Sequence, residues 1–175
     1  MEPIRLVPPT EGNLDQVWDY RRECLDAGSS MDGCGPLQRS ESPAEWLAQV
    51  IRCTDPATVP EGKVQATQFL AVRESDSRLV GMIQVRHYFN EYLEKYAGHI
   101  GYSVRPCERR RGYAKEMLRL ALPYCKGLGL TRVLVSCEVS NAGSRRTILS
   151  NGGVYERTVH EPKEDIDLER YWITL

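Results

Sequence analysis

The sequence lacks any apolar run long enough to span a membrane, and residues 1–5 lack the basic and then apolar pattern of a secretory signal peptide. An excess of one charge is also missing, because 23 Lys and Arg residues stand against 24 Asp and Glu residues. The net charge of −1 gives no general reason to expect nucleic acid or a membrane surface as a partner. We therefore expect a cytoplasmic protein that binds neither.

Cysteine pairs with C-x-x-C spacing are absent as well, although the chain has six cysteines. A chain of 175 residues is long enough to bury a core without covalent staples, so we expect reduced thiols. The same spacing, with three histidines as the only nitrogen ligands, predicts that no metal is bound. The length also predicts one domain over residues 1–175.

The glycine loops of nucleotide-binding proteins are missing: neither G-x-x-x-x-G-K-[ST] nor G-x-G-x-x-G after a strand occurs. What the sequence does contain is a strand, a cationic turn and a helix start in direct succession over residues 99–114. Ile100, Tyr102 and Val104 lie on one side of an extended segment, which is the two-residue period of a strand. From Ala114 onward, apolar residues recur at three- and four-residue steps and predict a helix.

The turn into this helix favours an anion. The first backbone N–H groups of a helix lack acceptors, and the helix dipole places positive partial charge there. Gly112 has no Cβ, so a phosphate can approach the backbone, and Arg109, Arg110 and Arg111 can each donate two parallel bonds to it. The turn therefore suits a pyrophosphate, with a solvated charge run as the alternative.

Periodicity and turn signals predict the remaining elements. Helices are expected to begin at Thr10 or Asn13, at Ser42 and at Asn141. The expected strands cover residues 4–7, 69–72, 79–85, 133–137, 154–159 and 168–173. Strand 100–104, the helix after Gly112 and strand 133–137 together predict a right-handed parallel unit.

The spacing Arg109-x-x-Gly112-x-Ala114, after a strand that ends in Val104-x-Pro106, resembles the acyl-CoA-binding signature of the GNAT superfamily of N-acetyltransferases. The order of elements is similar to the GNAT fold over nearly the whole chain. The resemblance implies an α/β (α+β) fold in which a mixed central sheet of about seven strands is flanked by about four helices. It also implies a parallel strand-helix-strand unit at the acyl-CoA site.

A second segment strengthens this resemblance. Asn141-x-x-Ser144 leading to Gly152 is similar to the superfamily's Asn-x-x-Ala segment that ends in Gly-Phe. The resemblance implies direct transfer of an acetyl group from acetyl-CoA to an amine of a small molecule or peptide, with no covalent enzyme intermediate. It implies that the following residues bind acetyl-CoA: Tyr102, Ser103, Val104 and Arg105 along the pantetheine arm, Arg109, Arg110, Arg111, Gly112, Tyr113 and Ala114 at the pyrophosphate, and Asn141 and Ser144 on the other side.

The catalytic positions depart from the superfamily's commoner pattern. The helix position seven residues after Asn141, often a tyrosine that protonates CoA, is Ile148. The strand position five residues before Asn141, where some relatives carry a glutamate base, is Ser136. Four other residues are therefore the candidates, each with a structural role as its alternative: Glu138 and His99 as the base, and Tyr102 and Tyr155 as the acid.

The missing tyrosine also leaves a second function open, a non-catalytic module that binds acyl-CoA as a regulator or sensor. The acceptor amine is not identified by the sequence, because specificity in such scaffolds depends on loops such as residues 28–40 and 90–98. The oligomeric state is equally open, with a homodimer among the options.

Overall fold

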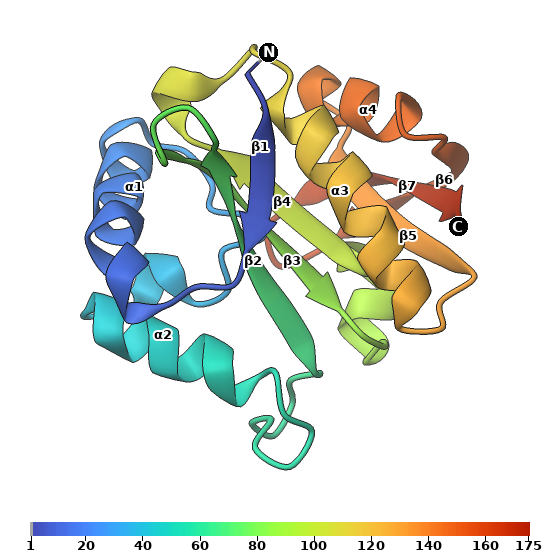
Figure 1. The fold of residues 1–175 in the computed structure, drawn as a ribbon. Coiled ribbons are helices and arrows are strands. Elements are labelled where there is room, and N and C mark those ends of the chain that lie inside the picture. The colour runs from blue at the N-terminus through green and yellow to red at the C-terminus, as the bar shows by residue number, and fades with distance from the viewer. Residues whose placement is uncertain (1) are drawn as a thin grey trace.

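Seven strands form two antiparallel sheets, shown in Figure 1, in a computed structural model that describes residues 2–175. The first sheet has the order β1 (Ile4–Val7), β2 (Ala66–Arg73), β3 (Leu79–Arg86) and β4 (Ile100–Val104). The second sheet has the order β5 (Arg132–Glu138), β7 (Ile166–Thr174) and β6 (Val154–Glu161). The strand count and positions confirm the predicted pattern.

Within residues 2–175, four α-helices flank the sheets: α1 (Leu14–Asp26), α2 (Pro43–Arg52), α3 (Tyr113–Gly127) and α4 (Ala142–Leu149). Four shorter turns join them: η1 (Glu11–Asn13), η2 (Leu37–Arg39), the π-turn η3 (Leu93–Ala97) and η4 (Pro106–Glu108). The predicted cap is present at α2, because Ser42 Oγ accepts from Glu45 N at 3.1 Å. The expected α/β fold with about four helices is thereby confirmed.

Helix α3 fixes the relation between the two sheets. Its buried face, which includes Met117, Leu118 and Ala121, packs in one core with Ile83 of the first sheet and Val133 of the second. Helices α1 and α2 bury their apolar residues in a separate core against β2 and β3. In Figure 1, α1 and α2 lie to the left of the first sheet, whereas α3 crosses in front of it.

The expected parallel unit takes a different form. Every strand pair within residues 2–175 is antiparallel, and β4 does not pair with β5. The segment just before β4 forms one isolated bridge to β5, between Gly98 and Val135. There, His99 N donates to Leu134 O at 2.8 Å, and Leu134 N donates to the imidazole Nδ1 of His99 at 2.9 Å. Because the imidazole takes an N–H group that a neighbouring strand would otherwise bind, pairing does not continue. A gap therefore separates the rest of β4 from β5.

Two further predictions concern the chain as a whole. All six cysteines are free thiols, as expected from their spacing. No helix within residues 2–175 combines the length and the apolar character needed to cross a membrane.

Candidate functional site

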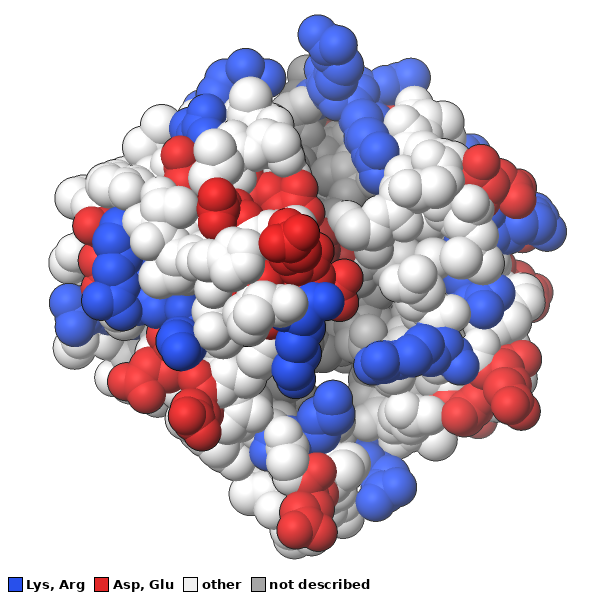
Figure 2. Space-filling model, turned by 180° about the vertical axis from the view of Figure 1, so that it is seen from behind, with Lys and Arg blue, Asp and Glu red and all other residues white. Residues whose placement is uncertain are grey.

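A cleft of about 1340 Å³ opens along the gap between β4 and β5. Its walls come from β4, the N-terminus of α3, the end of β5, the start of α4 and the loop at residues 27–32. Figure 2 shows this face hollowed, with Lys and Arg side chains near the upper end and Asp and Glu side chains along one side. The cleft is lined by most of the sequence-predicted site residues: Tyr102, Ser103, Val104, Arg109, Arg110, Gly112, Tyr113, Ala114, Glu138, Asn141 and Ser144.

The start of α3 presents uncapped backbone amides to this cleft. Gly112 is the N-cap residue, and its φ of 87° lies in the left-handed region that favours glycine. A glycine cap has no side chain to accept from the first amides of the helix, so no side-chain cap bond forms. Tyr113, Ala114 and Lys115 line the cleft, and their N–H groups precede the first intrahelical bond, Glu116 N to Gly112 O. This end of the cleft is therefore suited to an anion.

The three arginines of the turn have different positions. Arg109 and Arg110 line the cleft, and Arg109 Nε also donates to Val104 O at 3.1 Å. Arg111 does not line the cleft, because its Nη1 lies 3.1 Å from a carboxylate oxygen of Glu108. Two of the three guanidinium groups therefore border the cleft, and the predicted contact of Arg111 with the ligand stays a prediction.

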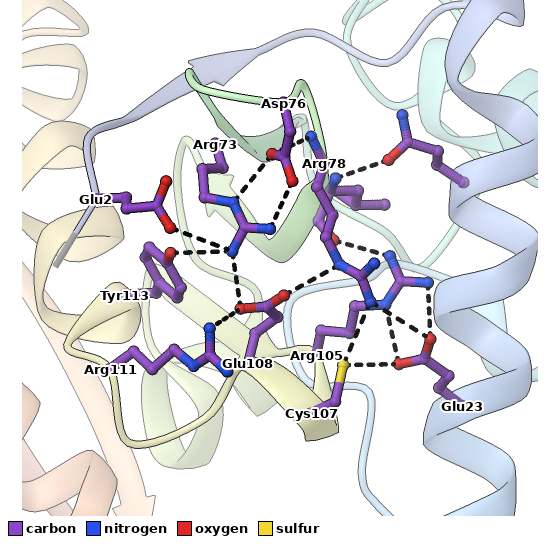
Figure 3. Close-up of polar contacts among 12 residues, drawn as sticks. Glu2, Glu23, Arg73, Asp76, Arg78, Arg105, Cys107, Glu108, Arg111 and Tyr113 are labelled. Atoms are coloured by element: carbon purple, nitrogen blue, oxygen red, sulfur yellow. Dashed lines mark hydrogen bonds and ion pairs between the residues drawn. The ribbon is translucent and has the colours of Figure 1, made fainter.

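Glu108 is the centre of a charge network beneath the turn, shown in Figure 3. Its side chain is 6% exposed, and three guanidinium groups lie near its oxygens: Arg73 and Arg78 at 3.0 Å and Arg111 at 3.1 Å. Arg73 also pairs with Asp76 at 2.6 Å, and hydrogen bonds to Asp76 and Tyr113 raise the pKa of Arg73. The sequence analysis missed Glu108, although an acid directly before three arginines was a local signal.

Arg105 belongs to the same region and also departs from expectation. Its guanidinium is buried, lies 2.9 Å from Glu23 and donates to Leu79 O at 3.0 Å, while its backbone N–H donates to Val80 O. This pairing lowers the pKa of Glu23. The residue does not line the cleft. Its backbone N–H group and guanidinium are both occupied and join the end of β4 to α1, so its predicted contact with a pantetheine arm stays a prediction.

Tyr102 and Ser144 join the two sides of the cleft. The Tyr102 hydroxyl lies 2.8 Å from Ser144 Oγ, so a phenol from β4 contacts the first turn of α4. Burial raises the pKa of Tyr102, which keeps the phenol protonated at neutral pH. Asn141 Oδ1 accepts from Ser144 N at 3.0 Å, so its side chain caps α4. Tyr102 and Ser144 therefore place two hydroxyl groups inside the cleft.

Ser103 points to the opposite side of β4, as strand alternation requires. Its Oγ accepts from Tyr20 OH at 2.9 Å and lies 3.2 Å from the Cys34 thiol. Burial raises the pKa of Cys34 to about 12, so this thiol stays protonated. The hydroxyl of Ser103 therefore joins β4 to α1 and its following loop rather than facing a ligand.

The candidate bases occupy different environments. Glu138 is exposed at the end of β5, lines the cleft and accepts from Ser140 Oγ at 2.9 Å. His99 is buried, packs with its ring centroid 4.0 Å from that of Phe89 and does not line the cleft. The structure therefore places His99 apart from the cleft, because β5 and Phe89 cover its imidazole, and its role as a base stays a prediction. Tyr155 also lies outside the cleft, with its hydroxyl 2.9 Å from Thr158 Oγ1.

The buried His99 is expected to make stability depend on pH. Burial, helped by the nearby charge of Arg86, lowers its pKa to about 4, so between pH 4 and the ordinary value the unfolded chain binds a proton that the folded chain does not. The His99 contribution to the free energy of unfolding is therefore complete above about pH 6.5 and falls by about 3 kcal/mol on acidification to pH 4. Urea denaturation of wild type and His99→Gln across this range measures the difference; equal slopes would contradict the prediction.

The site does not contain a cluster of metal-binding side chains within the described residues. Within residues 2–175, no group of three or more His, Cys, Asp or Glu side chains is arranged to hold a metal ion. The cleft instead combines free amides, two guanidinium groups, paired hydroxyls and a carboxylate. These groups suit a ligand that carries phosphates at one end and reacts by acyl or proton transfer at the other.

Comparison with known proteins identifies the family to which this fold and cleft belong. Among curated proteins, none matches the sequence. The fold is similar to ribosomal-protein-S5-alanine acetyltransferase from Vibrio fischeri (TM-score 0.72, 16% identity, covering 98% of this chain and 91% of that one). It is also similar to a ribosomal L7/L12 α-N-protein acetyltransferase in complex with coenzyme A (0.74, 15%, 98% and 94%) and to a GNAT-family acetyltransferase from Bacillus anthracis (0.68, 20%, 99% and 95%). A family model described as "Acetyltransferase (GNAT) domain" matches residues 4–154, and the chain therefore belongs to the GNAT acetyltransferase family.

Proposed function

We propose that this chain transfers an acetyl group directly from acetyl-CoA to an amine, with the cleft between β4 and β5 as its active site. The observation that carries the proposal is the uncapped start of α3, which opens onto one end of that cleft beside Arg109 and Arg110. Acetyl-CoA is the acetyl donor of the family. Its pyrophosphate carries the charge that amides and guanidinium groups at this end recognise.

The contacts of each wall suggest how the rest of the donor is held. Backbone groups of Tyr102 to Val104 face the gap that β5 leaves unpaired, and they are available to the amide-bearing pantetheine arm. Asn141 and Ser144 border the same gap from α4. The reacting thioester then lies toward the start of β4, on the side away from the arginines.

Direct transfer needs a neutral amine, a base that removes its proton and an acid that protonates the departing thiolate. Glu138 is our candidate base, since it is the exposed carboxylate at the end of β5 within the cleft. The Tyr102 and Ser144 hydroxyl pair is our candidate acid, because both residues line the cleft, their oxygens lie 2.8 Å apart, and a phenol is protonated at neutral pH. No residue has to form a covalent intermediate in this scheme.

Gly112→Asp tests the donor site. An aspartate there brings a carboxylate to the position proposed for the pyrophosphate and strains a backbone with φ of 87°. We expect the Kd for CoA, measured by calorimetry, to rise at least about 100-fold, because repulsion replaces charge-assisted hydrogen bonds.

Gly129→Asp is the matched control, since Gly129 has φ of 85°, has open space around a built Cβ and lies outside the cleft. It carries the same added charge and backbone strain, and CoA affinity is expected to stay within about threefold of wild type. Equal affinities of the two variants would overturn the donor site. CoA binding without release of free thiol for any amine would instead support the sensor module.

A further inference from the structure

Arg86 is the last residue of β3 and lies beside the start of β4, where its N–H donates to His99 O. It lines the cleft together with Tyr92 and Ala97, whereas Val104, at the other end of β4, leads toward the arginine-rich turn. The guanidinium lies close to the main chain, because a Cβ built on Gly101 would be 3.2 Å from Arg86 Nη2. Arg86 therefore belongs to the end of the cleft that faces away from the phosphate site.

The guanidinium of Arg86 has protein partners on only one side. Its Nη1 donates to the carbonyl oxygens of Ala97 and Gly98, both at 3.3 Å. Its Nε and Nη2 have no hydrogen-bond acceptor within residues 2–175, and no carboxylate of those residues lies within ion-pair distance. Three donor N–H bonds of a guanidinium that has five are thus available to the cleft.

The fully buried arginines Arg73, Arg105 and Arg170 differ from the partly buried Arg86 in having carboxylate partners. Arg73, Arg105 and Arg170 are each at most 8% exposed, and each has a carboxylate oxygen within 3.0 Å. Arg86 is only partly buried, and this burial lowers its pKa. A guanidinium in such surroundings is stabilised by an anion, and here the chain does not supply one.

A negative charge lies across the same end of the cleft without neutralising Arg86. Asp32 lines the wall formed by the loop after α1 and accepts from Ser30 Oγ at 2.8 Å. It attracts Arg86 at long range but forms no ion pair with it. The two walls therefore present opposite charges to one space, an arrangement that suits a ligand with both an ammonium and a carboxylate group.

We propose that Arg86 binds a carboxylate of the acceptor, and that the acceptor is an amine with a carboxylate a few bonds away, as in an amino acid. This inference rests on the proposed acetyl transfer and adds the substrate class to it. The fork of Arg86 donates two parallel bonds to the carboxylate. Asp32 attracts the ammonium group before its proton is removed.

Matched acceptor pairs test the proposal, using release of free thiol from acetyl-CoA as the assay. The pairs are alanine with ethylamine, phenylalanine with 2-phenylethylamine, and lysine with 1,5-diaminopentane; each pair differs only by the carboxylate. At least one amino acid is expected to show a kcat/KM about 10-fold or more above that of its decarboxylated partner. Thermal-shift titration of the CoA-loaded protein with the same compounds gives an independent measure of binding.

Arg86→Gln is expected to lower kcat/KM for that amino acid by about 10- to 100-fold and to change the value for its decarboxylated partner by less than about threefold. Arg86→Lys keeps the charge without the fork and is expected to fall between wild type and Arg86→Gln. Arg22→Gln, at an exposed arginine of α1, is the control for loss of a surface charge. Because each comparison is made within one variant, a general loss of folding cancels.

Two results would overturn the proposal. One is that no amino acid exceeds its decarboxylated partner in either turnover or binding. The other is that Arg86→Gln lowers both members of a pair equally, which would assign the arginine to the thioester or to the fold. Both results leave the loss of CoA binding in Gly112→Asp unchanged, so they are distinguishable from failure of the proposed function.

Discussion

Glu108→Leu is expected to lower the free energy of unfolding by about 1–3 kcal/mol, because it removes the buried acceptor of Arg73 Nη1 while Asp76 still pairs with the rest of that guanidinium. Arg73 is the group most affected, since its side chain is 10% exposed and its Nη1 lies 3.0 Å from the carboxylate. Arg78 and Arg111 are more exposed and can turn to water. Urea denaturation of the variant and the wild type measures the loss.

Glu116→Leu is the matched control on α3. Glu116 also pairs with an arginine, at 2.7 Å, but Arg119 is 59% exposed, so loss of this pair is expected to cost less than about 1 kcal/mol. A Glu108 variant no less stable than the Glu116 variant would contradict the role assigned to the network. Glu108→Gln keeps the shape of the side chain without its charge and is expected to fall between the two.

The network also has a consequence for the proposed donor site. Glu108 holds Arg111 away from the cleft and ends η4, directly before the turn that carries Arg109 and Arg110. In Glu108→Gln this turn is expected to lose its fixed position, so the KM for acetyl-CoA rises more than kcat falls. A purely structural role would lower the active fraction of the protein and leave KM unchanged.

Local patterns predicted most of the fold. The alternation of residues 100–104 and the apolar steps after Ala114 depend on neighbouring residues, and they located β4 and α3 correctly. The cap at Ser42 depends on a residue three positions away. The turn between β4 and α3 was found for the same reason, since every group it uses lies within a few residues of Gly112.

The parts that sequence reasoning missed depend on contacts distant in the chain. Glu108 pairs with Arg111 three residues away, which a local pattern could have indicated, but its partners Arg73 and Arg78 come from a separate hairpin, so the network as a whole has no local pattern. The sequence analysis missed Arg86 for a similar reason. Its proposed role depends on the absence of a carboxylate partner in the folded chain, which its sequence neighbours do not reveal. The gap between β4 and β5 was likewise hidden, since Gly98 and Val135 are far apart along the chain.

Tyr102→Phe is expected to lower kcat about 100-fold or more while the KM for acetyl-CoA stays within about threefold, because general acid catalysis contributes factors of this size. The change removes the hydroxyl that lies 2.8 Å from Ser144 Oγ and leaves the ring in place between β4 and α4. Steady-state kinetics with the best acceptor measures both constants. Tyr155→Phe is the control, since the Tyr155 hydroxyl lies 2.9 Å from Thr158 outside the cleft, and kcat is expected to stay within about twofold.

Ser144→Ala tests whether the hydroxyls of Tyr102 and Ser144 act on the same proton or independently. If the two hydroxyls act together on one proton, each single variant removes the same step, and Tyr102→Phe with Ser144→Ala is expected to be no slower than the worse single variant. Fully additive losses would mean that the two hydroxyls act independently rather than on one shared proton. A Tyr102→Phe enzyme with unchanged kcat would remove the pair from the chemistry and return the search for the acid to the cleft.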